Sequence, residues 1–329
     1  MKNRITLILL ICLVAISLIL PLVACDKDKP VDPVDTPAYT YVDGSSVLIN
    51  MGTYPQKIAD VSVETIKTNG VYNQETGYYT YDSKQYKIIS ARPCHEYMTP
   101  TFSNGEVVED NKEYAFVVQN IVWKIINKSL GEDNYYVYSK YILDTEIYQE
   151  QSRIADVGDN KYFLKDSKGN IMENVYANNW EYSKLRETLK QFYNIAFDSN
   201  NKKGIIQTSN TNEHAKKSSR TYITKDYVFC LTSADAQNSR YSFIEEDMQR
   251  RLRIVSDYAI ARGAFYIEYE DVGKVGWAWT RSPSNDISSS LGSNAADKVQ
   301  NKGEITKQYI LSDSDYKVGY APAMRVVKL

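Results

Sequence analysis

Short runs of β-branched and aromatic residues, separated by polar turns, dominate the first half of the chain. Four runs have the length and composition of strands, namely Ser46–Met51, Tyr78–Ala91, Tyr114–Ile126 and Asn134–Leu143. Gly, Asn, Asp and Ser cluster between them, and these residues favour turns because they tolerate the backbone angles that turns require. We therefore expect a strand-rich part that extends to about residue 150.

The middle of the chain changes to the period of a helix. The first predicted helix begins after the N-cap residue Ser183, ends at Asp198, and has an apolar face that consists of Leu185, Leu189, Phe192, Tyr193, Ala196 and Phe197. The second extends from about Ser242 to Arg262 and ends at Gly263. Its apolar face consists of Ile244, Met248, Leu252, Val255 and Ala259.

Strands return after the second helix. They are predicted at Phe265–Tyr269, Gly276–Arg281 and Ala323–Leu329, and a further short strand, Asp226–Thr232, lies between the helices. Strands followed by helices and again by strands are typical of an α+β fold rather than of a doubly wound sheet. The predicted architecture is therefore α+β, with twisted, mostly antiparallel sheets, two main helices and long loops. Residues 41–329 are expected to form one large domain.

The N-terminus has the pattern of a bacterial lipoprotein signal. Two basic residues precede the apolar run Ile5–Leu20, and Leu22-Val-Ala-Cys25 follows in the form of a lipobox. We expect residues 1–24 to be a signal peptide and Cys25 to be the lipidated residue. An uncleaved transmembrane anchor and a plain signal peptide are the alternatives.

The segment after Cys25 is charged and rich in proline. Its sequence, Asp26 to Ala38, cannot form a core, and proline favours an extended chain, so residues 25–40 are predicted to be a flexible tether. Two acyl chains on one cysteine give stable attachment to a bilayer. The domain is therefore expected on the extracellular face of the cell membrane, held there by its lipid.

Composition excludes some classes of partner and chemistry. The chain has 39 basic and 41 acidic residues and a net charge of −2, with no basic stripe, so no nucleic-acid partner is expected. The 28 tyrosines suit half-buried strands or a contact surface. His95 and His214 lie far apart, and Cys94 and Cys230 are isolated, so neither a metal site nor a cofactor is predicted. The two cysteines are interpreted as buried thiols, with a disulfide as the alternative.

Several strings, in order along residues 45–329, resemble an uncharacterised domain family of Firmicutes surface proteins and lipoproteins. The family signature is Trp-Trp-x-Arg-Ser-Pro followed by Gly-Val-Arg-Pro-Ala-Leu. The matching strings are Gly52-Thr-Tyr-Pro-Gln56, Ile121-Val-Trp123, Ser139-Lys-Tyr-Ile-Leu-Asp144, Trp180-Glu-Tyr-Ser-Lys-Leu-Arg186, Ala196-Phe197, Asp226-Tyr-Val-Phe229, Asp257-Tyr-Ala259, Trp277-Ala-Trp-Thr-Arg-Ser-Pro283 and Gly319-Tyr-Ala-Pro-Ala-Met324. Two positions depart from the signature: Ala278 replaces a tryptophan and Ala321 replaces the arginine.

The end of the family signature is also similar to that of C-type-lectin-like domains of the sulfatase-modifying-factor kind. This resemblance implies a small twisted sheet flanked by two helices, with neighbouring termini, over residues of about 150–329. The catalytic cysteine pair of those relatives is not carried over, because Cys94 and Cys230 are isolated in this sequence.

Trp277, Trp279 and Arg281 are the candidate binding residues. On a strand they alternate onto one face, with Ala278 and Thr280 on the other. Aromatic rings beside a guanidinium can stack on sugars. The alternative is a core role, in which both tryptophans pack inside and Arg281 bridges to carbonyls or a carboxylate.

The sequence favours a lipid-anchored cell-surface binding module over an enzyme. Its ligand is expected to be a glycan or another surface protein, because no catalytic constellation is visible and the anchor presents the domain outward. Two alternatives stay open: an extracellular hydrolase that uses carboxylates, and a passive structural lipoprotein.

Overall fold

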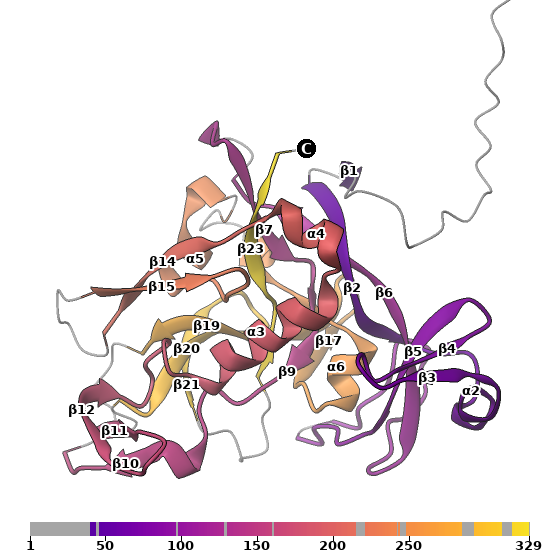
Figure 1. Cartoon of the computed structure of the whole chain (residues 1–329), viewed down its shortest axis with the longest axis horizontal. Coiled ribbons are helices and arrows are strands. Elements are labelled where there is room, and N and C mark those ends of the chain that lie inside the picture. The colour runs from indigo at the N-terminus through magenta and orange to yellow at the C-terminus, as the bar shows by residue number, and fades with distance from the viewer. Residues whose placement is uncertain are drawn as a thin grey trace, which may run out of the picture. The chain divides into compact units, whose positions relative to one another are not determined.

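Most of the strands predicted in the first half meet in one curled sheet (Figure 1). The computed structural model describes residues 40–43, 46–96, 98–127, 130–159, 161–214, 221–241, 243, 248–284, 293–310 and 318–328. These residues belong to one compact unit that begins at Pro37. The large sheet has nine antiparallel strands: β1 (Thr40–Asp43), β2 (Ser46–Ile58), β3 (Val71–Asn73), β4 (Tyr78–Tyr81), β5 (Lys84–Ser90), β6 (Glu113–Ile125), β7 (Asn134–Ser139), β13 (Ile205–Ile206) and β23 (Ala323–Val327).

The predicted strands of this sheet differ from the observed ones mainly at their ends. The strand predicted at Ser46–Met51 continues to Ile58, and Tyr114–Ile126 is confirmed as β6. Tyr78–Ala91 was wrong as a single strand because Asp82 and Ser83 both have positive φ and turn the chain into the hairpin β4–β5. The run Asn134–Leu143 is likewise divided, into β7 and the short β8.

The later part of the chain supplies two further sheets. One has five strands: β9 (Asp144–Thr145), β19 (Ala278–Pro283), β20 (Ala295–Val299), β21 (Ile305–Tyr309) and β22 (Gly319–Tyr320). The other has four: β8 (Tyr141–Ile142), β16 (Ile254–Val255), β17 (Tyr266–Tyr269) and β18 (Gly273–Gly276). Most pairs are antiparallel, while β19–β22 and β16–β8 are parallel.

Two small sheets lie toward the left of Figure 1. They consist of β10 (Ile154–Asp156), β11 (Tyr162–Lys165) and β12 (Ile171–Tyr176), and of the hairpin β14 (Thr208–Glu213) with β15 (Thr221–Asp226). The β14–β15 hairpin buries Asn210, Asn212, Thr224 and Asp226. It was not predicted from the sequence. Both faces of β14 carry polar residues, so its sequence lacks the alternation of apolar and polar positions that indicates a strand.

The longest described helix is α3 (Lys184–Ala196), as predicted. Its N-cap is Ser183, whose hydroxyl accepts from the backbone N–H of Arg186, and its buried residues include Leu185, Leu189 and Phe192. The remaining helical elements are short: α2 (Val63–Asn69), η2 (Gln151–Arg153), α4 (Ser199–Gly204), α5 (Ser233–Gln237), η3 (Ser239–Tyr241), η4 (Met248–Arg251) and α6 (Asp257–Ala261). Figure 1 shows α3 crossing the centre of the view.

The second long helix, predicted from Ser242 to Arg262, is wrong. Part of it lies outside the described residues, and the described part is a 3₁₀ turn, the strand β16 and the five-residue α6. Ile254 and Val255 pair with β8, and Ser256 then caps α6. A strand partner supplied by a distant segment overrides the local helical period. Asp226–Thr232 was also wrong as a strand, since Asp226 ends β15 and, after it, Phe229 forms only an isolated bridge, to Ala323.

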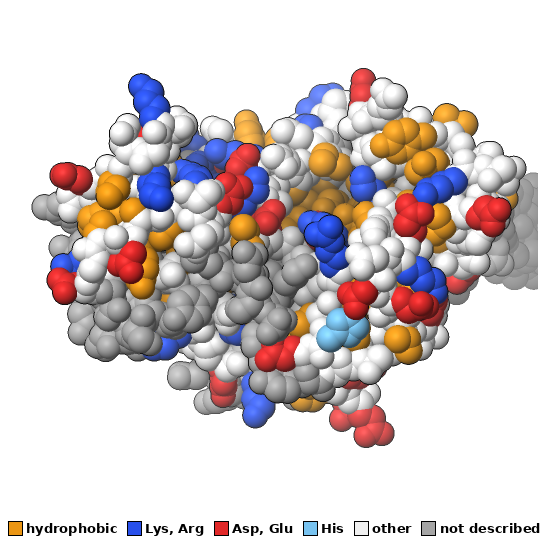
Figure 2. Space-filling model, turned by 90° about the horizontal axis from the view of Figure 1, so that it is seen from below, with side chains coloured by type: hydrophobic (Ala, Val, Ile, Leu, Met, Phe, Trp, Pro, Cys, Tyr) orange, Lys and Arg blue, Asp and Glu red, His pale blue; other side chains and the backbone are white. Residues whose placement is uncertain are grey.

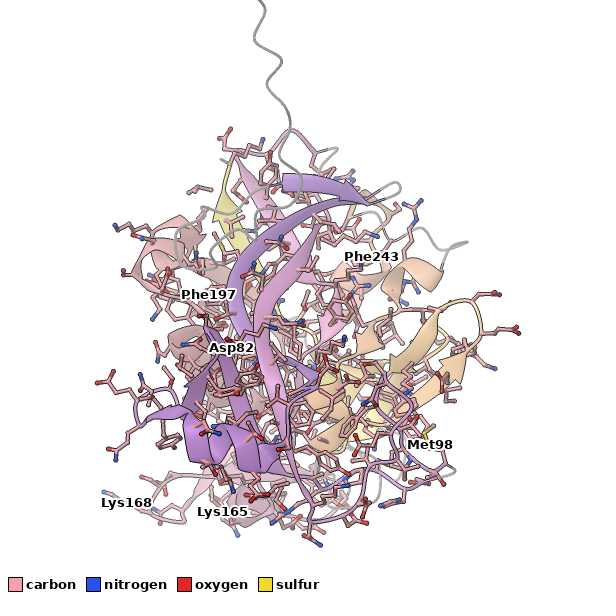
Figure 3. All side chains as sticks on the ribbon, turned by 90° about the vertical axis from the view of Figure 1, so that its right-hand side faces the viewer. Asp82, Met98, Lys165, Lys168, Phe197 and Phe243 are labelled. Atoms are coloured by element: carbon pink, nitrogen blue, oxygen red, sulfur yellow. The ribbon has the colours of Figure 1, made fainter. Side chains whose placement is uncertain are left out.

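One continuous hydrophobic core includes residues of the large sheet, α3, α6 and the five-stranded sheet. Phe197, just after α3, stacks on Trp123 of β6 and approaches Gly52 of β2, as Figure 3 shows for the labelled Phe197 beside the long violet strand.

Cys94 and Cys230 are both buried and form no disulfide with each other. The described part of the chain contains no helix whose length and apolarity would let it cross a membrane. The fold is thus α+β in the broad sense, mostly strands with short helices.

Candidate functional site

A cavity of about 610 Å³ opens beside β19 and β20. We call it the hydroxyl cavity, because hydroxyl, amide and carboxyl groups dominate its wall. Its lining residues come from β14, α5, β19, β20 and β21 and are Glu213, Ser233, Ala234, Gln237, Ser282, Ser284, Asp297, Ile305, Thr306 and Lys307. A cavity of this size suits a ligand of one or two sugar rings.

Asp297 is the central acidic group of the hydroxyl cavity. Its carboxylate accepts a hydrogen bond from the Ser233 hydroxyl at 2.8 Å. Burial raises the pKa of Asp297 to about 6; the Ser233 hydrogen bond opposes this shift, and the charge of Glu213 adds to it. Two carboxyl groups in different environments therefore line the same cavity.

A set of hydroxyl groups joins α5 to β19 at the cavity wall. The backbone N–H of Ser233 donates to the Ser282 hydroxyl at 3.0 Å, and the Thr280 hydroxyl donates to the carbonyl of Asp297 at 2.9 Å. The Thr306 hydroxyl is buried and has no hydrogen-bond partner among the described residues. Since an unpaired buried hydroxyl is unfavourable, Thr306 is a group that a bound molecule or water would satisfy.

Arg281 lies behind this wall and holds its parts in place. Its guanidinium donates to Asn212 of β14 at 3.1 Å and to the carbonyl of Cys230 at 2.8 Å, and it pairs with Asp235 of α5 at 3.5 Å. The side chain is 7% exposed. Arg281 therefore positions the two elements that carry Glu213 and Ser233, and it does not itself face the cavity.

Trp277 and Trp279, the other two candidate residues, lie near Arg281 but do not line the hydroxyl cavity. Trp279 is 1% exposed, donates to the carbonyl of Glu146 at 2.8 Å, and packs edge-on against Tyr148. Trp277 is half-buried against Phe265 and donates to Asn301. This arrangement corresponds to the core interpretation, in which Arg281 bridges to carbonyls and a carboxylate.

The cavity-lining residue Ser282 was not predicted as a site residue and lies on the opposite face of β19 from Arg281. Strand alternation separates Thr280 and Ser282 from Trp279 and Arg281. The string Thr-Arg-Ser-Pro contains these hydroxyl residues, but Thr and Ser are common in strands and turns and do not by themselves indicate a site. Cys25, the predicted lipidation site, lies outside the described residues.

The site offers no evident place for a metal ion. In the ranges given above, no three His, Cys, Asp or Glu side chains gather in a way that could hold one. On the face seen in Figure 2, the described basic and acidic side chains are interspersed rather than separated by sign. The Ser, Thr and Gln side chains of the hydroxyl cavity can donate and accept hydrogen bonds.

Comparison with known families places most of this architecture in one family. The family model described as a domain of unknown function, DUF6273, matches residues 133–326, which include every residue that lines the hydroxyl cavity. Comparison with curated proteins and with solved structures finds no match. Since the matched segment covers more than half of the chain, this protein belongs to the DUF6273 family.

Proposed function

We propose that the protein is a lipid-anchored module of the bacterial cell surface that binds a glycan in the hydroxyl cavity. The observation that carries the proposal is the wall of that cavity, where donors and acceptors surround a space of about 610 Å³. Sugars present many hydroxyl groups that both donate and accept, and such groups pair well with Ser, Gln and Asp side chains. Ala234 and Ile305 add apolar contact for the ring faces.

Calorimetric titration with soluble fragments of cell-wall glycan tests the ligand. Gln237→Ala and Thr306→Val, which alter the wall, should each weaken binding at least about tenfold, the effect of about 1.4 kcal/mol. Ser209→Ala, on an exposed position of β14, is the matched control and should bind as the parent does. Equal affinity in all variants would contradict the proposed site.

The anchor is the second part of the proposal. It rests on the lipobox Leu22-Val-Ala-Cys25 and on the charged tether that follows. With Cys25→Ala the protein should no longer incorporate labelled palmitate, because the sulfur that carries the lipid is gone. Cys12→Ala, in the apolar run, is the control and should be labelled as the parent is. Undiminished labelling of the Cys25 variant would contradict lipidation at this residue.

We also propose kinship with the Firmicutes surface domains and the C-type-lectin-like arrangement. In support, the first and last strands of the matched segment are neighbours: β7 and β23 pair antiparallel, with Ala323 opposite Tyr138. Neighbouring termini are what that resemblance implies. An experimental structure whose strand order differs from the lectin-like one would contradict this kinship without affecting the glycan site.

A hydrolase is the second candidate function, favoured by one observation. Asp297, with a pKa raised to about 6 by burial, and the exposed Glu213 line one cavity. A protonated carboxyl group and an ionised one are the pair that glycoside hydrolysis requires. Release of reducing ends from a bound glycan, abolished in both Asp297→Asn and Glu213→Gln, would establish this activity. Binding without any release would leave the module as a binder.

A further inference from the structure

We propose that a second cavity, between the N-terminal strands and the family segment, binds an N-acetylated sugar. This cavity has a volume of about 470 Å³. We call it the amide cavity; its lining residues are Asn50, Gln56, Lys57, Ser103, Gln119, Asn120, Val122, Tyr141, Ile254, Val255, Ser256 and Asp257. It shares no lining residue with the hydroxyl cavity, so the proposal does not rest on the function proposed above.

The amide wall arises where β2 departs from regular pairing with β6. The register shifts twice, between Asn50 and Thr53 and again between Pro55 and Lys57. The side-chain amide of Gln56 fills part of this irregular region by donating to the carbonyls of Gln119 and Asn120, each at 3.1 Å. Bulges re-aim side chains at the places where they interrupt a ladder. The result is a wall of amide side chains on two adjacent strands.

Asn50 carries the strongest sign of a missing partner. Its side-chain oxygen is buried and accepts no hydrogen bond from any described residue. A buried acceptor left unpaired costs about 1–3 kcal/mol, so such an atom calls for a donor. Asn50 itself lines the amide cavity, so rotation of its side chain would bring this oxygen to an N–H or O–H of a ligand there.

The lining of the amide cavity has two charged residues, Lys57 and Asp257, and its other polar groups are neutral. The Asp257 carboxylate is already occupied, because it accepts from the backbone N–H groups of Ile58 and Ser103 and from the Ser103 hydroxyl at 2.7–3.0 Å. The amides of Gln119 and Asn120 are exposed and uncharged. Amide groups can donate and accept at once, as the vicinal hydroxyls of a sugar require.

The apolar lining selects for an acetamido group. Val122, Ile254 and Val255 line the same cavity as Asn50 and Tyr141. An acetamido substituent has an N–H for the Asn50 oxygen and a methyl group for the valine and isoleucine side chains. The Tyr141 ring offers a face on which a sugar ring can pack. A sugar without the acetamido group would satisfy the hydroxyl contacts alone.

Titration of the full folded domain with N-acetylglucosamine, followed by amide NMR shifts, tests this proposal. We expect saturable shifts at Asn50 and Asn120, and at least about tenfold weaker binding of glucose. Asn50→Ala and Asn120→Ala should each lower affinity at least about tenfold. Since the Asn50 oxygen has no described partner, Asn50→Ala should keep the parent's unfolding midpoint. Gln85→Ala, an exposed amide on β5, is the matched control.

Two outcomes would overturn the proposal: no saturable shift at these residues, or equal binding of glucose and N-acetylglucosamine. Failure of the hydroxyl-cavity variants to affect glycan binding would count against the proposed function only. Loss of N-acetylglucosamine binding in Asp297→Asn, with retention in Asn50→Ala, would move the site to the hydroxyl cavity and contradict this inference.

Discussion

The guanidinium of Arg186 donates to the carboxylate of Asp226 at 2.6 Å, although the residues are 40 positions apart. The Asp226 side chain is 1% exposed and also accepts from Thr224, Asn210 and Trp180. Helix α3 and the β14–β15 hairpin are therefore joined by a buried, fully paired charge as well as by packing.

Arg186→Ala leaves the Asp226 carboxylate buried without its counter-charge. The free energy of unfolding should fall by about 3–5 kcal/mol, which urea denaturation followed by circular dichroism measures. Lys190→Ala is the control, because Lys190 is exposed one turn further along α3; it should change stability by less than about 0.5 kcal/mol. A similar, small effect of both changes would show that the pair does not hold the hairpin.

Asp297 should make stability fall as the pH rises from about 4 to about 6. Its folded pKa is raised to about 6 by burial, above the ordinary value of 3.8, so the folded state holds the proton more tightly. The stabilisation is fully present below the ordinary pKa and is lost as the pH passes the raised one, amounting to as much as about 3 kcal/mol. Asp297→Asn should remove this part of the pH dependence. Superimposable stability curves of parent and variant, measured from pH 4 to 7, would disprove the raised pKa.

Gly52→Ala should destabilise the protein strongly. Gly52 has a φ of +72°, and a Cβ there would lie 2.6 Å from the Phe197 ring. Backbone strain of about 1–2 kcal/mol and overpacking of about 1–3 kcal/mol should both contribute. Gly105→Ala isolates the backbone contribution, since Gly105 also has a positive φ but no atom within 4 Å of such a Cβ. Thermal melts of the two variants should therefore differ by several degrees, with Gly52→Ala the lower.

Trp279→Ala and Trp277→Ala separate a core role from a binding role for the tryptophans in and just before β19. Trp279 is buried, so its truncation should cost about 3–5 kcal/mol of stability. Trp277 is half-buried and should cost less. A folded Trp277→Ala protein should bind glycan as the parent does if the hydroxyl cavity is the site. Loss of binding in that variant, with its melting temperature unchanged, would indicate that Trp277 contacts the ligand.

Local residue patterns were enough to predict the elements that form largely independently of the segments packed against them. The face of α3 and the N-cap Ser183 were evident from spacing, because a helix satisfies its own backbone and shows one apolar stripe. The long strands β2 and β6 were evident from their β-branched and aromatic residues. The hairpin β4–β5 was missed because two non-glycine residues, Asp82 and Ser83, take the left-handed conformation at its turn.

The candidate site depended on contacts that spacing cannot reveal. The strand β19 was predicted, together with the alternation of its side chains between two faces. What each face contacts depends on the elements that cover it. Both faces of β19 are buried. On one face, Asn212, Cys230 and Asp235 meet Arg281 from distant segments. On the other, Ser282 lines the hydroxyl cavity.

The sequence by itself determined the α+β class, the main helix, the long strands and the membership of an uncharacterised domain family, because these follow from local periodicity and from strings of residues. The tertiary structure alone decided that Ile254 and Val255 form a strand, that Trp279 and Arg281 lie inside, and that Asp297, Ser233 and Glu213 share one cavity. The physical reason is that burial and pairing are properties of segments brought together from far apart in the chain. The residue pattern within one segment therefore does not predict its burial or its pairing partner.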